Sequence, residues 1–535
     1  MASVYLLFAL LAGGLFFSGC GKGRKAGISR SGEGSGSNGK VLNYTVANDL
    51  ANMDPSLITD IESALVATQV YEGLVRFKKD SVEIEPALAE RWELSANGLQ
   101  WTFHLQPGIK FTDGTPCDAD AVVFSVMRQM DENHPFHVPG KMRSSKMMFG
   151  DLSTTESQLV TDVSATDAQT VVFTLARPYT PFLKNIAMTP ASIVSPAAVK
   201  ALKKDFNTTM TGTGPFAIKT YKRDHYVTLV RNPDYRGPRP ALDEIRFQII
   251  QDPNVRMNSL RKGDSDIITG IEPAGVDLLK NEEGIKLMSE PSMNLGYISL
   301  NNQRAPFDNA KVRLALCHAI DRDYIVNTLF SKTSEKATGI IPPGMLGYDA
   351  KRAGFAYDVN KTKALLAEAG YPNGFTVTLS THGSPRIYNP VGVKLAERIQ
   401  QDLAKVGVTA KLDQMEFPTF LAKEKSRDFQ MSISGWISDN GDPDNFIYEL
   451  AGREDNSCAY SNPDATRLMR QAATEADEGK RGELYKKADA MLAENPPFIV
   501  LNHAKQMLGV RNRVKGFALH PTGVAQLAPV DLTSQ

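Results

Sequence analysis

Residues 358–413 read DVNKTKALLAEAGYPNGFTVTLSTHGSPRIYNPVGVKLAERIQQDLAKVGVTAKLD, a segment in which helix and strand patterns alternate. Asp358 is of a residue type that caps helix N-termini, and the helix predicted over the following KTKALLAEA ends at Gly370. The apolar and β-branched run after it predicts a strand at 375–380. A helix followed directly by a strand is a basic unit of α/β proteins.

The second half of this segment repeats the same order. Apolar residues recur every four positions from Leu395 to Leu403, so they line one face of a helix predicted at about 391–405. Gly407 is placed to end that helix, and another strand is predicted at 409–413. The segment therefore predicts two consecutive helix–strand units.

The alternation continues in both directions along the chain. Asp118 is suited to cap a helix predicted at 119–130, and Ser95-Ala96-Asn97-Gly98 is predicted to form the turn of a hairpin. Strands are also predicted at 42–46, 92–94, 99–105, 171–175, 226–231, 245–250 and 430–434, and a helix at 63–72. Strands that alternate with helices predict an α/β protein with helices covering its sheets.

Length and composition narrow the class of protein. The chain has 535 residues, which is more than one domain of ordinary size. Hydrophobic residues make up 42% and charged residues 22%, as in ordinary soluble globular proteins. Lys+Arg and Asp+Glu each total 60, whereas a dedicated nucleic-acid-binding protein would usually have a basic excess. We therefore expect a multidomain globular body and no nucleic-acid partner.

The motifs of catalysis and metal binding do not occur in the sequence. It contains no HExxH, GxSxG or CxxC pattern, and Gly212-Thr213-Gly214-Pro215 lacks the lysine of a phosphate-binding loop. Pro135 separates the close pair His134 and His137, which favours a loop over a metal site. The four cysteines are too few for a disulfide scaffold, and we expect no structural disulfide. We expect no catalytic residue, no metal and no cofactor.

The first forty residues are predicted to direct export. Val4–Phe17 is an apolar run of 14 residues, too short to span a bilayer but suited to a signal peptide, predicted at 1–19. The small residues before Cys20 resemble the lipobox of bacterial lipoproteins, in which the cysteine carries a diacylglycerol. The alternative is a simple secretory signal with an incidental cysteine. The Gly/Ser/Lys-rich residues after Cys20 predict a flexible tether, so that 20–40 would hold the body at a membrane surface.

Five ordered blocks resemble the bacterial extracellular solute-binding proteins of family 5, which serve peptide ABC transporters, and most of all their dipeptide-binding branch. The resemblance extends from about Val41 to Leu527. The blocks are PALAERW with FTDGTP and DADAVVFSVMR (86–128), GTGPFAIKTYKRDHYVTLVRNPDYRG (212–237), NLGYISLNNQRAPFDNAKVRLALCHAIDRDYIV (294–326), IPPG with the helix after it (341–370), and GWISDNGDPDNF (435–446).

This resemblance implies an α/β, two-lobed periplasmic-binding-protein-like clamp that encloses its ligand between the lobes. Mapped onto this chain, residues 41–292 would form the first lobe, with an extra sub-lobe at about 77–215. Residues 293–504 would form the second lobe, and 505–535 would return to the first. Residues around 60–63 are expected to face the ligand from the first lobe.

The resemblance also implies two charged ligand-binding residues. Asp439 matches the aspartate that binds the peptide ammonium, although a solvated loop carboxylate or a helix N-cap after Pro443 are the alternatives from the loop sequence alone. Arg386 matches the arginine that binds the peptide carboxylate, and a guanidinium grips a carboxylate with two parallel bonds. Its alternative is an ordinary surface arginine.

The neighbours of these two residues would complete the site. Gly435, Trp436 and Ile437 are expected to present a strand edge to the peptide backbone, as in β-augmentation. Tyr388 would add a phenol near the carboxylate. Trp436 and Phe417 would wall side-chain pockets, or belong to the core.

The function that the resemblance implies is capture of dipeptides or short peptides and their delivery to the permease and ATPase subunits of an importer. The protein would be a monomer held outside the cell membrane by its lipid anchor. The alternatives are a glutathione- or haem-binding relative, a binder of longer peptides, and a surface adhesin or peptide-sensing receptor built on the same clamp.

Overall fold

The computed structural model describes residues 39–150 and 158–533 of the chain. The predicted signal peptide, Cys20 and all but the last two residues of the predicted tether lie outside this range. None of the helices in the described ranges is long and apolar enough to cross a membrane.

The largest element is a twelve-stranded mixed sheet in the order β16-β15-β17-β13-β18-β11-β1-β10-β9-β8, with β12 and β14 also pairing with β18. We call its two parts the first and second sheet regions. The first contains β1 (Val41–Val46), β8 (Phe216–Lys222), β9 (Tyr226–Arg231), β10 (Glu244–Ile249), β11 (Ile267–Ile268) and β12 (Ile285–Pro291). The second contains β13 (Asn294–Leu300), β14 (Ser334–Lys336), β15 (Thr376–His382), β16 (Thr409–Met415) and β17 (Met431–Ile437).

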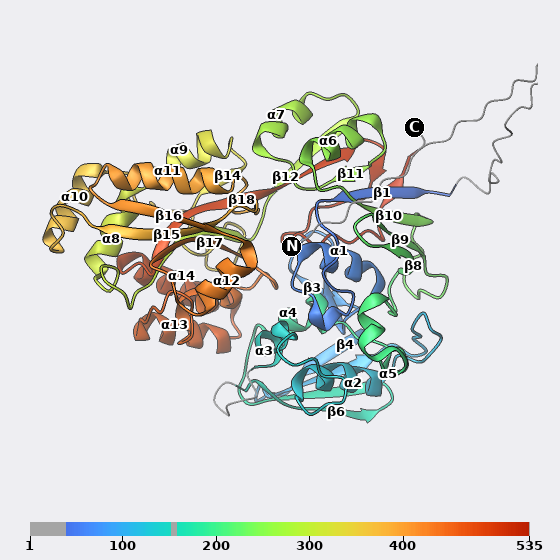
Figure 1. The fold of residues 1–535 in the computed structure, drawn as a ribbon. Helices are drawn as coiled ribbons and strands as arrows, with labels where there is room; N and C mark the ends of the chain where they lie inside the picture. The colour runs from blue at the N-terminus through green and yellow to red at the C-terminus, as the bar shows by residue number, and fades with distance from the viewer. Residues whose placement is uncertain (1–38, 151–157, 534–535) are drawn as a thin grey trace, which may run out of the picture. The chain divides into compact units, whose positions relative to one another are not determined.

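One strand, β18 (Phe498–Arg511), belongs to both regions (Figure 1). Its N-terminal half pairs with β13 and β14, and its C-terminal half pairs with β11 and β12. The pairing passes from one set of partners to the other between Asn502 and Lys505. Only Ser292 and Met293 separate β12 from β13, so the chain crosses between the regions beside the same part of β18.

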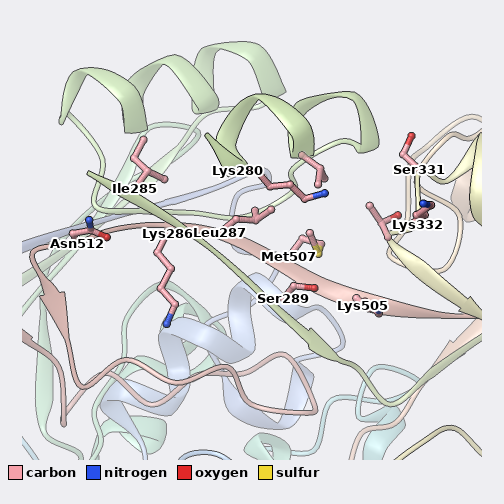
Figure 2. A pocket seen from close by; sticks show the side chains of 12 residues that line it. Lys280, Ile285, Lys286, Leu287, Ser289, Ser331, Lys332, Lys505, Met507 and Asn512 are labelled. Atoms are coloured by element: carbon pink, nitrogen blue, oxygen red, sulfur yellow. The ribbon is translucent and has the colours of Figure 1, made fainter. Parts of the chain in front are cut away.

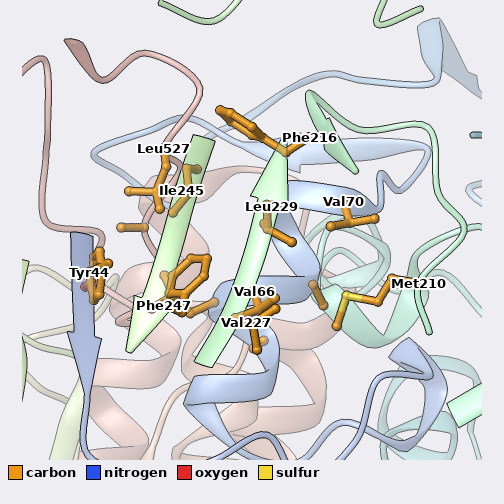
Figure 3. Packing of buried hydrophobic residues seen from close by; sticks show 14 of the residues in the cluster. Tyr44, Val66, Val70, Met210, Phe216, Val227, Leu229, Ile245, Phe247 and Leu527 are labelled. Carbon is orange, nitrogen blue, oxygen red and sulfur yellow. The ribbon is translucent and has the colours of Figure 1, made fainter. Parts of the chain in front are cut away.

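The first sheet region packs against α1 (Ile61–Val70) through a large apolar core. In this core Val66 and Val70 of the helix meet Val227, Leu229, Ile245 and Phe247 of β9 and β10 (Figure 3). Leu527, near the C-terminus, packs into the same core. The core therefore joins segments from both ends of the described chain.

A separate four-stranded antiparallel sheet lies within residues 77–215, in the order β4-β5-β7-β6. Its strands are β4 (Ala89–Leu94), β5 (Gln100–Leu105), β6 (Val160–Asp167) and β7 (Thr170–Leu175), and α2 (Ala119–Met130) packs beside them. The predicted hairpin is confirmed, because β4 and β5 pair across Ser95–Gly98. The cap of α2 is confirmed as well, since Asp118 accepts a hydrogen bond from Ala121 N–H. This sheet has its own core, which includes Phe103, Phe173 and Phe182.

The second sheet region is covered on both faces. On one face Ile298 and Ile433 meet α8 (Ala310–Ala319), α10 (Val359–Glu368) and α11 (Val393–Ala404). On the other face Leu295 and Tyr297 meet α13 (Pro463–Thr474) and α14 (Glu478–Glu494). Neighbouring residues of a strand point to opposite faces, which is why 295 and 298 enter different cores.

The predicted α/β units of 358–413 are present as α10, β15, α11 and β16, and β15 and β16 pair in parallel. The remaining helices are α3 (Arg143–Phe149), α4 (Phe182–Ile186), α5 (Pro196–Leu202), α6 (Pro253–Lys262), α7 (Pro273–Lys280), α9 (Arg322–Tyr324) and α12 (Phe417–Lys425). Two small sheets pair β2 (Val75–Phe77) with β3 (Ile84–Pro86), and β19 (Val514–Lys515) with β20 (Asp531–Leu532).

A buried ion pair joins α2 to the segment just before α1 and gives a test of the fold. The Arg128 guanidinium donates two hydrogen bonds to the Asp54 carboxylate, at 2.9 and 2.6 Å, and the two side chains are 3% and 5% exposed. Replacing Arg128 by Met leaves a buried carboxylate without its partner, so we expect the free energy of unfolding in urea to fall by about 3–5 kcal/mol.

The matched control is Lys311→Met, because Lys311 pairs with Glu368 at 2.9 Å with both side chains more than half exposed. This exposed pair is expected to contribute no more than about 1 kcal/mol. Equal losses of stability in the two variants would contradict the account of the buried pair.

Candidate functional site

The candidate site begins at the end of β17, where one side of the strand pairs with no other strand of the described residues. β17 pairs with β13 along its whole length, but with β15 only at Met431 and Ser432. Ser438 N–H donates a hydrogen bond to the carbonyl of Met293. In an antiparallel pair every second residue bonds the partner strand in this way, so the main-chain groups of Trp436 also point toward β13. Gly435 and Ile437 turn theirs to the other side, beyond the end of the β15 pairing. Of the three predicted backbone residues, Gly435 and Ile437 thus present the open strand edge.

Tyr388 lies directly on this strand. A Cβ atom at Gly435 would come within 2.2 Å of the Tyr388 ring, so the ring occupies the space that a side chain would need. Tyr388 is buried, and burial raises the pKa of its phenol to about 12. The glycine is required here for close approach of the aromatic ring. Trp436 is half-buried against the core that contains Leu295 and Tyr297, and its indole N–H has no partner among the described residues.

Asp439 follows β17 in a loop that is held in place by hydrogen bonds from the side chains of the loop itself. Its backbone N–H donates to Asn445 Oδ1 at 2.9 Å, and Asn445 Nδ2 lies 3.4 Å from Asp439 Oδ2. The side chain is open to solvent, yet protein surrounds it closely enough that desolvation raises the pKa of Asp439 to about 6. Asp439 is not the N-cap of the helix after it; Asp442 has that role for the short helix Pro443–Asn445.

Arg386 lies in a tight turn after β15. The turn is closed by reciprocal 2.9 Å bonds between the backbones of Arg386 and Asn389. The guanidinium stacks over the ring of Phe417, 3.7 Å from its centroid, at the start of α12. Its Nε is buried without a hydrogen-bond acceptor, and no carboxylate of the described residues pairs with it. The residue as a whole is half-buried, so the guanidinium keeps donors that can bind an anion.

The surroundings of Arg386 fix its stacking partner. Phe417 and Phe420 hold the His382 ring between them, with ring centroids 4.8 and 5.0 Å away. His382 is fully buried, and burial lowers the pKa of its imidazole, so the ring adds no second positive charge. Phe417 is half-buried and stacks against the guanidinium, and its part in walling a side-chain pocket stays a prediction.

The first turn of α1, which packs on the first sheet region, brings the acidic residue Glu62 near Arg386. Burial raises the pKa of Glu62, and the hydrogen bond from Asn48 and the charge of Arg386 act against this rise. Arg386 is thus within electrostatic range of the first turn of α1. Asp60 caps the helix through Ser63 N–H at 2.8 Å, while its second oxygen is buried without a donor. The sequence indicated residues 60–63 as a group, but no motif distinguished Glu62.

One cavity among the described residues lies away from Arg386 and Asp439. It measures about 630 Å³ and is bounded by β12, β18 and the turn Ser331–Thr333 (Figure 2). Leu287 and Met507 form an apolar floor, and Lys280 and Lys332 lie at the rim. None of the predicted ligand-binding residues lines it. In the described ranges, no three His, Cys, Asp or Glu residues lie close enough together to hold a metal, and Cys117, Cys317 and Cys458 are buried free thiols.

Comparison with known proteins places this geometry in a family. Residues 83–457 match the profile described as bacterial extracellular solute-binding proteins, family 5 Middle. The dipeptide-binding protein of Escherichia coli (strain K12) is 35% identical over 507 residues, which cover 90% of this chain and 93% of that protein. Heme-binding protein A of Haemophilus influenzae is 34% identical over 507 residues, which cover 92% of each chain.

A solved structure shares the architecture. The ABC transporter-associated periplasmic binding protein DppA of Helicobacter pylori, in complex with peptide STSA, superposes with a TM-score of 0.82 at 31% identity. The match covers 92% of this chain and 98% of that one. The mixed α/β fold described above is that of the two-lobed periplasmic binding proteins. The chain belongs to the bacterial extracellular solute-binding proteins, family 5.

Proposed function

We propose that this protein is the substrate-binding component of a peptide ABC importer and that it captures dipeptides, or other short peptides, by their two termini. One observation carries the proposal: an acid, Asp439, and a base, Arg386, follow the C-terminal ends of the neighbouring parallel strands β17 and β15, and neither forms an ion pair with a described residue. It releases its ligand unchanged to the permease and ATPase subunits.

The chemistry of the ligand explains why both charges are needed. A dipeptide at neutral pH is a zwitterion, and each terminus that loses water must gain a partner. Asp439 accepts hydrogen bonds from the ammonium, and Arg386 donates two to the carboxylate. The termini of an extended dipeptide lie about 6–7 Å apart, at about 3.3–3.6 Å per residue. A fixed acid and base thus select ligand length.

Main-chain groups supply the rest of the affinity. Gly435 and Ile437 hold their N–H and C=O groups where an extended peptide adds as a strand. Tyr388 lies on Gly435 and keeps its phenol protonated at physiological pH. Because this recognition uses termini and backbone, it tolerates many ligand side chains.

The lobe assignment of the proposal is 41–292 and 505–535 for the first lobe, with a sub-lobe at about 77–215, and 293–504 for the second. The change of partners along β18 and the short link between β12 and β13 support these boundaries. We further propose that Cys20 carries a lipid and that the monomer is anchored outside the cell membrane. The sequence around Cys20 supports the anchor.

The relative named for haem raises an alternative ligand. An axial histidine or tyrosine for haem would have to reach the cleft. His382 is fully buried between two phenylalanines, and Tyr388 is buried against Gly435. The unpaired acid and base favour a peptide.

The roles of the two charged residues are tested together by changing both protein and ligand. Wild type, Asp439→Asn and Arg386→Met are titrated by calorimetry with Ala-Leu, N-acetyl-Ala-Leu and Ala-Leu-amide. We expect Asp439→Asn to weaken Ala-Leu binding by about 3–5 kcal/mol, because the buried ammonium loses its partner.

The decisive result is that each variant stops distinguishing the blocked from the free form of one ligand terminus. Asp439→Asn should no longer distinguish the acetylated from the free ligand, and Arg386→Met should no longer distinguish the amide from the acid. A variant that keeps wild-type discrimination at the corresponding terminus would overturn that residue's assignment.

The raised pKa of Asp439 predicts a pH-dependent affinity. In the ligand-free protein this pKa is about 6, and only the ionised carboxylate binds an ammonium. Ala-Leu affinity should therefore be constant near pH 7 and should fall as pH decreases through 6, approaching tenfold per pH unit below it. In Asp439→Asn this fall should be absent, although Asp444, whose pKa is also about 6, remains. The same pH profile in both proteins would contradict the assignment.

A further inference from the structure

The loop that carries Asp439 is held from the first-lobe side by residues that no motif indicates. Tyr179, from the sub-lobe, donates its hydroxyl hydrogen bond to Asp444 Oδ2 at 2.6 Å. Asn440 donates to Asn185 Oδ1 at 2.6 Å, and both of these amides are buried. Lys184 Nζ lies 3.4 Å from the carbonyl of Gly441. Three polar contacts thus link the sub-lobe segment 179–185 to the loop.

Steric fit limits the same loop. Gly441 has φ +68°, and a Cβ atom there would lie 2.4 Å from a methyl of Val82, another sub-lobe residue. Beside the loop, Thr180 N–H bonds the carbonyl of Ala473 at 2.8 Å, and its hydroxyl bonds that of Glu475 at 2.9 Å. The sub-lobe segment therefore packs on the loop and on the end of α13 together.

The Asp444 carboxylate lies between two tyrosine hydroxyls, those of Tyr179 and Tyr485. Tyr179 bonds one carboxylate oxygen, and Tyr485 of α14 lies 3.4 Å from the other. Asp444 is 8% exposed, so loss of the Tyr179 hydroxyl would leave a buried oxygen without a donor. Arg481, whose charge acts on Asp444, already bonds Asp442 at 2.6 Å. The Asp444 carboxylate would be drawn toward that charge, and the short helix Pro443–Asn445 would turn with it.

Asn445, the residue after Asp444, would pass this movement of the short helix on to Asp439. Asn445 accepts the Asp439 backbone N–H at 2.9 Å and places its amide 3.4 Å from Asp439 Oδ2. We propose that Tyr179 is a positioning residue for peptide binding: its hydroxyl, acting through Asp444 and Asn445, holds the Asp439 carboxylate where the ligand ammonium binds. This inference rests on the proposed function of Asp439 and adds a first-lobe determinant to it.

A double-mutant cycle tests the proposal. Tyr179→Phe removes only the hydroxyl, and it should weaken Ala-Leu binding in the otherwise wild-type protein by roughly tenfold to a hundredfold, the range of a lost hydrogen bond to a charged group. In the Asp439→Asn background it should weaken binding no further, because the carboxylate it positions is gone. A general structural defect would reduce affinity by the same factor in both backgrounds.

Tyr221→Phe is the matched control. Tyr221 also donates its hydroxyl to a carboxylate, Asp49 Oδ2 at 2.9 Å, but it does not contact the loop, so Kd should not change. If Tyr179→Phe yields little folded protein, Lys184→Ala enters the same cycle. Its side chain is 24% exposed, and its loss should give a smaller weakening that again depends on Asp439.

The possible results distinguish a failure of the role of Tyr179 from a failure of the role of Asp439. An unchanged Kd for Tyr179→Phe, or equal factors in the two backgrounds, would overturn the role of Tyr179 and leave that of Asp439 intact. An Asp439→Asn protein that binds Ala-Leu as wild type does would overturn the proposed function and this inference together.

Discussion

The continuity of β18 is the constraint on which the rest of the structure depends. One strand pairs with β13 and β14 through its first half and with β11 and β12 through its second. Both sheet regions therefore share a single backbone, and the chain crosses between them beside it. The strand that ends at the site, β17, is joined to this backbone through β13. The position of the binding edge is thus set by main-chain pairing, which ligand side chains do not disturb.

The charges at the site depend on a second constraint, the rigidity of the groups that hold them. Arg386 is fixed by a closed turn and by the Phe417 ring, and Asp439 is fixed by Asn445. In the same loop as Asp439, Asp442 forms an ion pair with Arg481, and both side chains are almost completely buried. A fixed acid and base avoid much of the entropy loss that flexible side chains incur on binding. The same rigidity makes distant contacts, such as that between Tyr179 and Asp444, able to affect the site.

Local features of the fold could be predicted from the sequence because they depend on neighbouring residues. Asp118 and Asp358 cap the helices that they were expected to cap, and the 95–98 turn joins two paired strands. The resemblance brought Asp439 and Arg386 into consideration, and their roles stay predictions.

Features that depend on distant residues could not be predicted in this way. The contact between Tyr179 and Asp444 joins residues 265 positions apart, and neither lies in a pattern that indicates the other. The close approach of Tyr388 to Gly435 and the effect of the Arg386 charge on the pKa of Glu62 likewise arise only when α1, the 386–389 turn and β17 come together. In the sequence, Gly435 gives little indication of its role, which is to leave room for the Tyr388 ring that packs against it.

The central claim is that the site binds dipeptides by both of their termini, and native mass spectrometry of residues 21–535 as purified tests it most directly. The bound species are released and sequenced. The account predicts a series of adducts that resolve into dipeptides with varied side chains. A single adduct with the mass of haem or glutathione, or peptides of four residues and more without dipeptides, would contradict it.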